Sequence, residues 1–227
     1  MLNNNLYQLL LTSFKHDYFE KDDVSWEVVT LNEVTSKVAT GLNPRKNFVL
    51  GHGNNYYVTI KNMGNNRIYL DDKCDKVDDD ALVKINKRSD LIAGDCLFSG
   101  IGTIGRVHFI DEPAINWNIS ESVFTMRAAH NISPEFLYLL LLNQDMQDYA
   151  NSLASGSAQK GIRMADLKKY KLRLPSVTEI KELTELWSPM LQQIKRNEKE
   201  SDNLSILRDT LLPKIMSGEI DVSNISI

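Results

Sequence analysis

The longest regular pattern of apolar positions lies near the end of the chain. After Pro175, the segment Ser176-Val177-Thr178-Glu179 has the Ser-x-x-Glu spacing of a capping box, which predicts a helix start. Apolar residues then recur at spacings of three and four, on either side of a polar middle: Ile180, Leu183, Trp187, Met190, Ile194, Leu204, Leu207, Leu211 and Ile215. One narrow apolar seam over so many turns is typical of a coiled-coil helix. A helix from Val177 to Leu212 would be roughly 50 Å long, at about 1.5 Å per residue.

A helix of that length would extend beyond a small domain, so the seam predicts a second helix, from a partner protein or a copy of this chain. The residues expected to contact that helix are Leu183, Trp187, Met190, Ile194, Leu204, Leu207 and Leu211. Asn197 and Ser201 fall on the seam, where polar residues can fix the register of a pair. Pro189 removes a backbone donor and predicts a kink near Glu185. The alternative is a solvated helix that packs on its own domain.

The pattern before this helix predicts an α+β chain. A short amphipathic helix is expected from Leu6 to Phe19, and helices from Pro134 to about Tyr149 and from Arg163 to Lys169. Short strands are expected at residues 26–31, 56–60, 67–70, 81–86, 95–99, 106–110 and 171–174, with exposed loops at 71–80 and 153–161. The predicted organisation is an N-terminal helix over residues 1–20, a mixed α/β domain with a twisted, loop-rich sheet over 24–175, the long helix over 176–219 and a tail over 220–227.

Composition sets the class of protein. The 227 residues allow one core of ordinary size plus the long helix. There is no run of about 18 apolar residues, and Met1 to Asn5 lacks the basic segment of a secretory signal, so no membrane association is expected. Cys74 and Cys96 have no metal or redox spacing. A cytoplasmic protein is the default expectation.

Charge is unevenly distributed along the chain, although its net value is -4. Asp71 to Asp80 holds six aspartates and two lysines, and without it the basic and acidic residues are equal in number. Val34 to Leu70 contains no acidic residue, and Ser155 to Arg173 has six basic residues against one acidic residue. Such segregation predicts a basic face suited to DNA, although chance clustering on a solvated surface is the alternative.

The glycines of Gly100-Ile101-Gly102-Thr103-Ile104-Gly105 match a dinucleotide-binding loop, and Phe98 to Gly102 matches a methyltransferase cofactor motif. Both motifs require a helix directly after the glycines, whereas Arg106 to Ile110 has a strand pattern. A tight turn between antiparallel strands is therefore expected. The histidines have no metal-ligand spacing, and no nucleophile elbow or phosphate loop is present in the sequence. We expect no catalytic residue, no bound metal and no cofactor in this chain.

Residues able to grip phosphates or read base edges are concentrated in the acid-free stretch and around two loops. Arginine and lysine pair with phosphates or guanine, and asparagine makes bidentate contacts to adenine, although the same asparagines are ordinary turn formers. The expected DNA-binding residues are Lys37, Asn43, Arg45, Lys46, Asn54, Asn55, Tyr56, Arg67, Ser99, Thr103, Arg106, Ser157, Gln159, Lys160 and Arg163.

The segment Leu207-Arg208-Asp209-Thr210-Leu211-Leu212-Pro213, with Ser217-Gly218 beyond it, resembles the conserved helix end of the specificity subunits of type I restriction-modification systems. Ala93-Gly94-Asp95, the Gly102 to Arg106 turn, Gly156 to Ile162 and Pro134 to Tyr138 are also similar to that family, in this order from about Trp26 onward. Such subunits have two target-recognition domains and two antiparallel helices, and this chain resembles the C-terminal half, natural or truncated.

The resemblance implies that each recognition domain reads one half of a bipartite DNA site. Modification subunits dock on the helices and methylate adenine, and restriction subunits join to cleave; those partners, not this chain, would use S-adenosylmethionine, ATP and magnesium. A homodimer through the long helix would rebuild the complete arrangement. The alternatives are a specificity subunit for a combined methylase-nuclease, and a coiled-coil decoy that binds the modification subunit without binding DNA.

Overall fold

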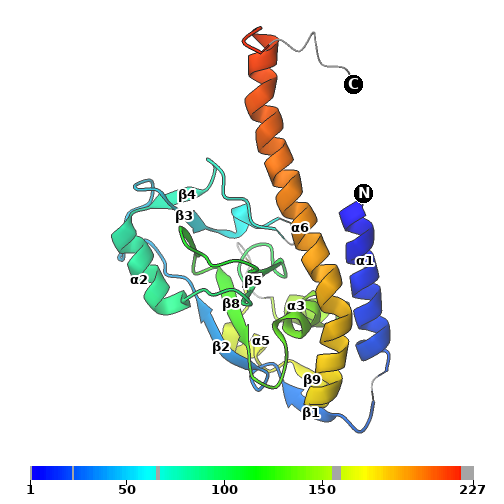
Figure 1. Ribbon diagram of the computed structural model, residues 1–227. Coiled ribbons are helices and arrows are strands. Elements are labelled where there is room, and N and C mark those ends of the chain that lie inside the picture. Colours follow the sequence, from blue (N-terminus) through cyan, green and yellow to red (C-terminus); the bar gives the residue numbers. More distant parts are fainter. Residues whose placement is uncertain (1, 22, 65–66, 155–159, 221–227) are drawn as a thin grey trace, which may run out of the picture.

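The computed structural model describes residues 2–21, 23–64, 67–154 and 160–220. Figure 1 shows a domain of small sheets and short helices beside two helices that lie antiparallel, with the end of the longer one projecting past the domain. The predicted α+β class is therefore correct, with the sheet divided into three. The expected tail lies outside the described residues, apart from its first residue, Ile220. Within those residues, no helix has the length and apolar character to cross a bilayer.

The strands form three separate sheets. Antiparallel β1 (Glu27–Thr30) and β9 (Lys171–Leu174) make a two-stranded sheet at the base of the domain. An antiparallel sheet has the order β2 (Thr35–Thr40), β8 (Val123–Ala128), β5 (Cys96–Ser99) and β6 (Val107–Phe109). In the third sheet, β3 (Asn55–Val58) pairs antiparallel with β4 (Asp75–Val77) and parallel with β7 (Trp117–Ile119).

Several strand predictions need correction. The sequence did not predict β2, β7 or β8, and β4 lies inside the aspartate run that was expected to be a loop. The predicted strand at 67–70 is wrong, because its described residues form only an isolated bridge between Ile68 and Met63. These segments are short, and their pairing partners are distant in sequence, so local alternation alone does not identify them.

Residues 81–86 are helical, which overturns the strand predicted there. They belong to α2 (Asp79–Ser89), which begins because the Asp78 carboxylate accepts a hydrogen bond from the Ala81 N–H at 2.7 Å. Acidic residues in the first turn and basic residues in the last turn complement the helix dipole. Ala81, Leu82 and Ile85 are buried at helical spacing.

Shorter helices complete the domain. The helix expected from Pro134 to Tyr149 is two helices, α3 (Pro134–Leu142) and α4 (Gln144–Ser152), because Asn143 has an extended backbone between them. A short α5 (Met164–Leu167) and a 3-10 turn, η2 (Ile60–Asn62), also form. All the residues from Phe136 to Leu141 are buried, so α3 is the central helix of the main core.

The helix predicted from Leu6 to Phe19 is confirmed and begins earlier. It consists of α1 (Leu2–Phe14) and a π-helical segment, η1 (Lys15–Phe19). Phe14 is buried, with its ring centroid 5.2 Å from that of Trp187 and 5.9 Å from that of Phe136. Asn3 donates to the Ile194 carbonyl and accepts from Asn197, so α1 runs antiparallel along the long helix (Figure 1).

The long helix, α6 (Val177–Met216), is present as predicted and continues through Pro189. Its capping box forms: the Ser176 Oγ accepts from the Glu179 N–H at 3.2 Å, and the Glu179 carboxylate accepts from the Ser176 N–H at 3.0 Å.

The seam of α6 divides into two parts. Trp187 and Ile194 are fully buried in the chain's own core, so these two do not face a separate partner, and half-buried Leu183 and Met190 pack against the same core. The first part therefore packs on its own domain, because α1 supplies the second helix. Leu204 and Leu207 are exposed and Leu211 is half-buried, beyond the end of that packing.

Candidate nucleic-acid interface

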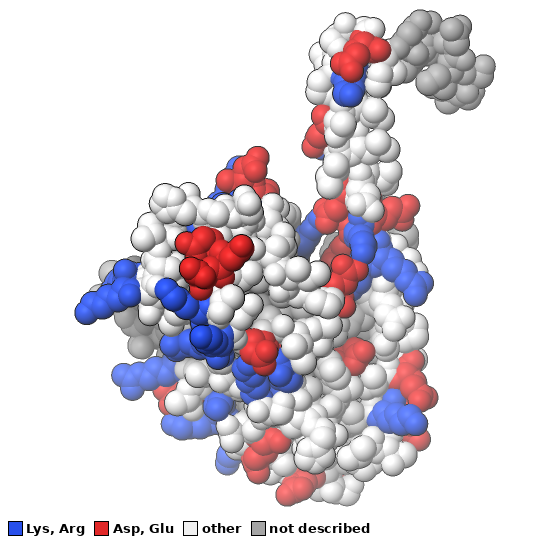
Figure 2. Space-filling model, turned by 60° about the vertical axis from the view of Figure 1, so that its left-hand side comes forward, with Lys and Arg blue, Asp and Glu red and all other residues white. Residues whose placement is uncertain are grey.

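One basic flank of the domain is formed by a loop and by α2. Exposed Arg45 and Lys46 lie in a turn closed by a 2.6 Å hydrogen bond from the Asn47 N–H to the Pro44 carbonyl. Lys84 of α2 donates to the Asn47 carbonyl at 3.4 Å, which places the turn beside the helix. Figure 2 shows Lys and Arg side chains gathered on this side of the molecule, next to an acidic cluster.

Three further cations of this flank were missed by the sequence analysis. Lys84, Lys87 and Arg88 are exposed on α2, where residues 81–86 were predicted to be a strand. Among the described residues, Lys87, Arg88, Arg45 and Lys46 have no ion-pair partner. The aspartate cap at Asp78, followed by apolar residues at helical spacing, was the signal that could have identified this helix and its basic end.

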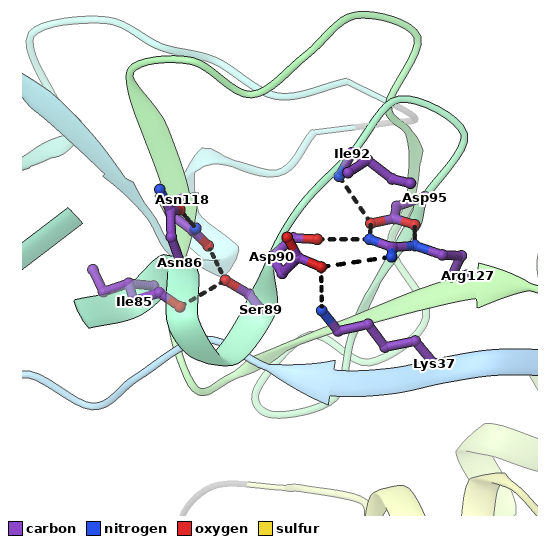
Figure 3. Close-up of polar contacts among 9 residues, drawn as sticks. All are labelled: Lys37, Ile85, Asn86, Ser89, Asp90, Ile92, Asp95, Asn118 and Arg127. Atoms are coloured by element: carbon purple, nitrogen blue, oxygen red, sulfur yellow. Dashed lines mark hydrogen bonds and ion pairs between the residues drawn. The ribbon is translucent and has the colours of Figure 1, made fainter. Parts of the chain in front are cut away.

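A charged network lies where α2 ends, between β2 and β8 (Figure 3). Lys37 and Arg127 are directly opposite each other on these strands. Arg127 donates to the buried Asp95 carboxylate through Nε at 2.7 Å and Nη2 at 3.0 Å, and Nη2 also donates to the Asp90 carbonyl at 2.6 Å. The predicted contact residue Lys37 donates to the Asp90 carboxylate at 3.2 Å, so it is already paired.

The ion pairs of this network shift the pKa values of Asp90 and Arg127. The hydrogen bond from Lys37, with further attraction to Lys37 and Arg127, lowers the pKa of the Asp90 carboxyl from its ordinary value. The hydrogen bond to Asp95 raises the pKa of the Arg127 guanidinium. Both groups therefore remain charged throughout the physiological pH range.

A second polar group anchors the same end of α2 to β7. Buried Ser89 donates to the Asn118 amide oxygen at 2.7 Å or to the Ile85 carbonyl at 3.0 Å, and the Asn118 amide donates to the Asn86 side-chain oxygen (Figure 3). These contacts fix the position of Asp90, because it directly follows Ser89.

The glycine turn lies between antiparallel β5 and β6, as predicted. Gly102 and Gly105 have φ values of 84° and 89°, which favour glycine. The Ser99 hydroxyl donates to the Thr103 carbonyl at 2.6 Å and accepts from the Arg106 N–H at 2.8 Å, so it closes the turn. β6 follows the turn where a cofactor loop would require a helix.

The turn brings several predicted contact residues together. The Gly102 N–H donates to the Lys160 carbonyl at 2.7 Å, and the Ile162 N–H donates to the Gly100 carbonyl at 2.9 Å. Thr103, Lys160 and Arg163 are exposed around this junction. Ser157 and Gln159, expected to contribute here, lie outside the described residues.

Other predicted contact residues have partners inside the chain. Buried Asn55 donates to Asp79 at 2.8 Å, Asn43 donates to Glu121 at 2.6 Å, and Arg106 donates to the carbonyls of Ile60 and Met63. Tyr56 lies under the Lys76 ammonium, 3.1 Å from the ring centroid, and Arg67 pairs with Asp202 of α6. Asn54 is exposed. The structure thus gives Asn55, Ser99 and Arg106 roles in holding loops, whereas the exposed cations remain available.

The described residues contain no group of three or more His, Cys, Asp or Glu side chains that could hold a metal ion. The family model described as type I restriction modification DNA specificity domain matches residues 23–204. The chain belongs to this family. The match includes the sheets, the basic flank and the packed part of α6, so the features described above are those of a type I DNA specificity domain.

Curated relatives of this specificity domain are similar over much of the chain. The MjaVIII specificity subunit of Methanocaldococcus jannaschii is 25% identical and aligns with 94% of this chain and 52% of its own length. The HindI specificity subunit of Haemophilus influenzae is 25% identical over 86% of this chain and 42% of its own length. The chain therefore spans about half the length of the curated relatives that it matches.

Solved structures show the same fold. An HsdS subunit from Thermoanaerobacter tengcongensis has a TM-score of 0.54 and 16% identity, covering 96% of this chain and 52% of that one. A type I S subunit from M. genitalium has a TM-score of 0.57 and 17% identity, covering 87% and 47%.

The structure explains one motif of this specificity domain. Gly94, at φ 91°, turns the chain before β5, and its neighbour Asp95 is the buried acceptor for Arg127. Ala93-Gly94-Asp95 thus fixes an arginine, and a role in chemistry is not needed to account for it.

Proposed function

We propose that this chain is a non-catalytic module that reads one half of a bipartite DNA site. The observation that carries the proposal is the match of the DNA specificity family over the whole recognition domain. The exposed cations of the 43–47 turn, α2 and the 160–163 segment support it, because DNA binding depends on cations that can neutralise phosphates. Bases would be read by loop residues between these cations.

The reaction would be performed by other chains. By the family resemblance, modification subunits that methylate adenine would dock on α6, and restriction subunits would join through them. The specificity subunits named above are relatives of this kind. This chain would recognise the DNA sequence, and its partner subunits would use S-adenosylmethionine, ATP and magnesium for the reactions.

A second copy of this chain would supply the other half of the site. The chain spans about half the length of its relatives, and Leu204 and Leu207 are exposed on the part of α6 that projects past the domain. Antiparallel pairing of these helix ends would bury Leu204 and Leu207. It would also relate the two recognition domains by a two-fold axis.

The methylated sequence tests the reading of half-sites. A host that carries this chain with its modification subunit should show a split, palindromic motif, because a symmetric dimer sees the same half-site twice. A non-palindromic motif would contradict the symmetric dimer, and the absence of any new methylation would contradict DNA recognition.

Solution mass tests the pairing of the helices. Replacing Leu207, which is 52% exposed, with glutamate should convert the dimer to a monomer in sedimentation equilibrium. Leu186→Glu is the matched control, because Leu186 is 51% exposed on the same helix but outside the seam. Equal effects of the two variants, or a monomeric wild type, would exclude pairing through this end.

The exposed apolar end of α6 also suits a decoy that binds the modification subunit without binding DNA. Reversing the charges of Arg45, Lys46 and Lys160 discriminates the two functions. A DNA reader should lose affinity in the assembled complex, whereas a decoy should not. Lys171→Glu is the control, because this exposed lysine lies on β9 in the separate two-stranded sheet.

A further inference from the structure

Asp90 occupies a position where its negative charge is unfavourable. It is the C-cap of α2, with φ 44° and ψ 59°, a left-handed conformation that is usual for glycine and that asparagine and aspartate adopt more often than other residues. Its carboxylate also lies at the negative end of the helix dipole, where a cation is favoured. A carboxylate at this end of a helix requires compensation from its surroundings.

Two cations provide that compensation. One oxygen of the Asp90 carboxylate is 3.2 Å from the Lys37 Nζ and 3.6 Å from the Arg127 Nη1 (Figure 3). Lys37 and Arg127 are opposite each other on β2 and β8, where like charges repel without an anion between them. The carboxylate therefore fills an anion site made by the strands.

The buried Asp95 carboxylate preorganises the site by holding Arg127. The Arg127 Nε and Nη2 bind the fully buried Asp95, so the guanidinium is held in place and its Nη1 faces Asp90. The Lys37 and Arg127 side chains are only 24% and 25% exposed, whereas Asp90 is 64% exposed. Both cations are thus largely covered by the fold, with Arg127 held by Asp95, and the anion between them is the part that solvent reaches.

We propose that Lys37 and Arg127 form a phosphate-binding site of the recognition domain, and that Asp90 occupies it as an internal competitor. The inference rests on the proposed DNA function. A DNA backbone phosphate has the same charge-assisted bonding chemistry toward lysine and arginine as a carboxylate. The basic last turn of α2, with Lys87 and Arg88, borders the site and attracts the same strand.

The competitor would reduce binding that does not depend on sequence. Phosphate contacts contribute affinity without sequence information, so masking this phosphate site weakens binding to random DNA. Specific DNA, held additionally by base contacts, can displace the exposed carboxylate into water. Asp90 would therefore raise the ratio of specific to non-specific affinity.

Asp90→Asn tests the inference, because asparagine suits the left-handed conformation and the variant should fold. Inorganic phosphate should raise the melting temperature of the full-length variant by more than that of the wild type. Its affinity for a random-sequence duplex should rise several-fold, and the slope of log K against log salt should steepen by about 1, for one additional phosphate. Adding Lys37→Gln should abolish all three changes.

Asp80→Asn is the control, because it removes one exposed carboxylate from the other end of α2. Equal gains from both variants would mean a general charge effect and would overturn the inference, as would no gain from Asp90→Asn. If the wild type binds DNA sequence-specifically but Asp90→Asn gains neither phosphate stabilisation nor random-sequence affinity, only this inference is wrong and the proposed DNA function stands. If phosphate raises the melting temperature of Asp90→Asn more than that of the wild type but no variant binds DNA, the anion site stands and the proposed DNA function is wrong.

Discussion

The indole N–H of Trp187 on α6 donates to the hydroxyl of Ser13 on α1, with 3.1 Å between nitrogen and oxygen. The Trp187 side chain is fully buried, and it joins two helices that lie at opposite ends of the sequence. The position of the long helix on the recognition domain therefore depends on α1, which completes the core around this residue.

Replacing Trp187 with alanine should destabilise the protein by about 3–5 kcal/mol, because the change leaves a large cavity between α1, α3 and α6. Leu186→Ala, at the exposed neighbouring position, should cost no more than about 0.5 kcal/mol. Urea denaturation, followed by far-ultraviolet circular dichroism because Trp187 fluorescence is lost in one variant, measures the free energy of unfolding of both variants. Similar losses in the two variants would show that α6 does not pack on α1.

The capping box of α6 predicts a pH dependence. Hydrogen bonds from the Ser176 N–H and hydroxyl lower the pKa of the Glu179 carboxyl below its ordinary value of 4.5. Because the folded-state pKa is depressed, this group stabilises the fold above 4.5, and the contribution is lost as the pH falls through the folded-state pKa. Glu179→Gln should therefore be less stable than the wild type near neutral pH, and the difference should shrink in acid.

Thermal unfolding at several pH values measures this difference, and Glu182→Gln is the control on the same exposed helix surface. A wild-type advantage over Glu179→Gln that stays constant into acid would contradict the role of the carboxylate charge.

Local signals explain which elements were predictable from sequence. The helical spacing and capping box of α6 are contained in neighbouring residues, and both were read correctly. The partner of its seam was not, because the contact of Trp187 with Ser13 joins positions far apart in sequence. In α2, the run Ala81 to Ile85 suits a strand or a helix, and the cap at Asp78 decides between them.

The candidate site shows the same division. Exposed Arg45, Lys46 and Lys160 were found from charge segregation, which is a property of the sequence. The pairing of Lys37 with Asp90, and of Arg127 with Asp95, depends on strand register and on the end of α2. No local pattern reveals such a network, so Lys37 was predicted without its partner and Arg127 was missed.

Removing the Arg127 side chain should be far more harmful than removing that of Lys37. Arg127→Leu leaves the buried Asp95 carboxylate without its cation, which should cost about 3–5 kcal/mol. Lys37→Leu should cost little, because its partner Asp90 is exposed to water. Adding Asp95→Asn to Arg127→Leu should recover part of the loss. Chemical denaturation of the wild type and these three variants measures the losses, and the absence of any recovery would mean that Arg127 acts mainly through packing.

The close approach of the glycine turn to β8 predicts a steric effect. A Cβ at Gly100 would lie 2.3 Å from the Phe124 ring, so Gly100→Ala should destabilise the protein by about 1–3 kcal/mol. Gly161→Ala is the matched control in the adjacent segment, because its nearest neighbour would be an Ile101 side-chain atom at 3.6 Å. The melting temperature of Gly100→Ala should be lower than that of Gly161→Ala. Equal melting temperatures would mean that the turn moves freely away from Phe124.

The two thiols should react only when the protein unfolds. Burial is the main cause that raises the pKa of Cys74 to about 11, and it also raises the pKa of the fully buried Cys96 thiol. Since the thiolate is the reactive form, a disulfide reagent at about pH 8 should label neither residue in the native state and both in denaturant. The labelling rate should follow the unfolding rate, and Cys74→Ser should remove one of two equal, slow amplitudes. Rapid labelling of one thiol in native protein would show that the sheet around Cys74 or the core around Cys96 opens without global unfolding.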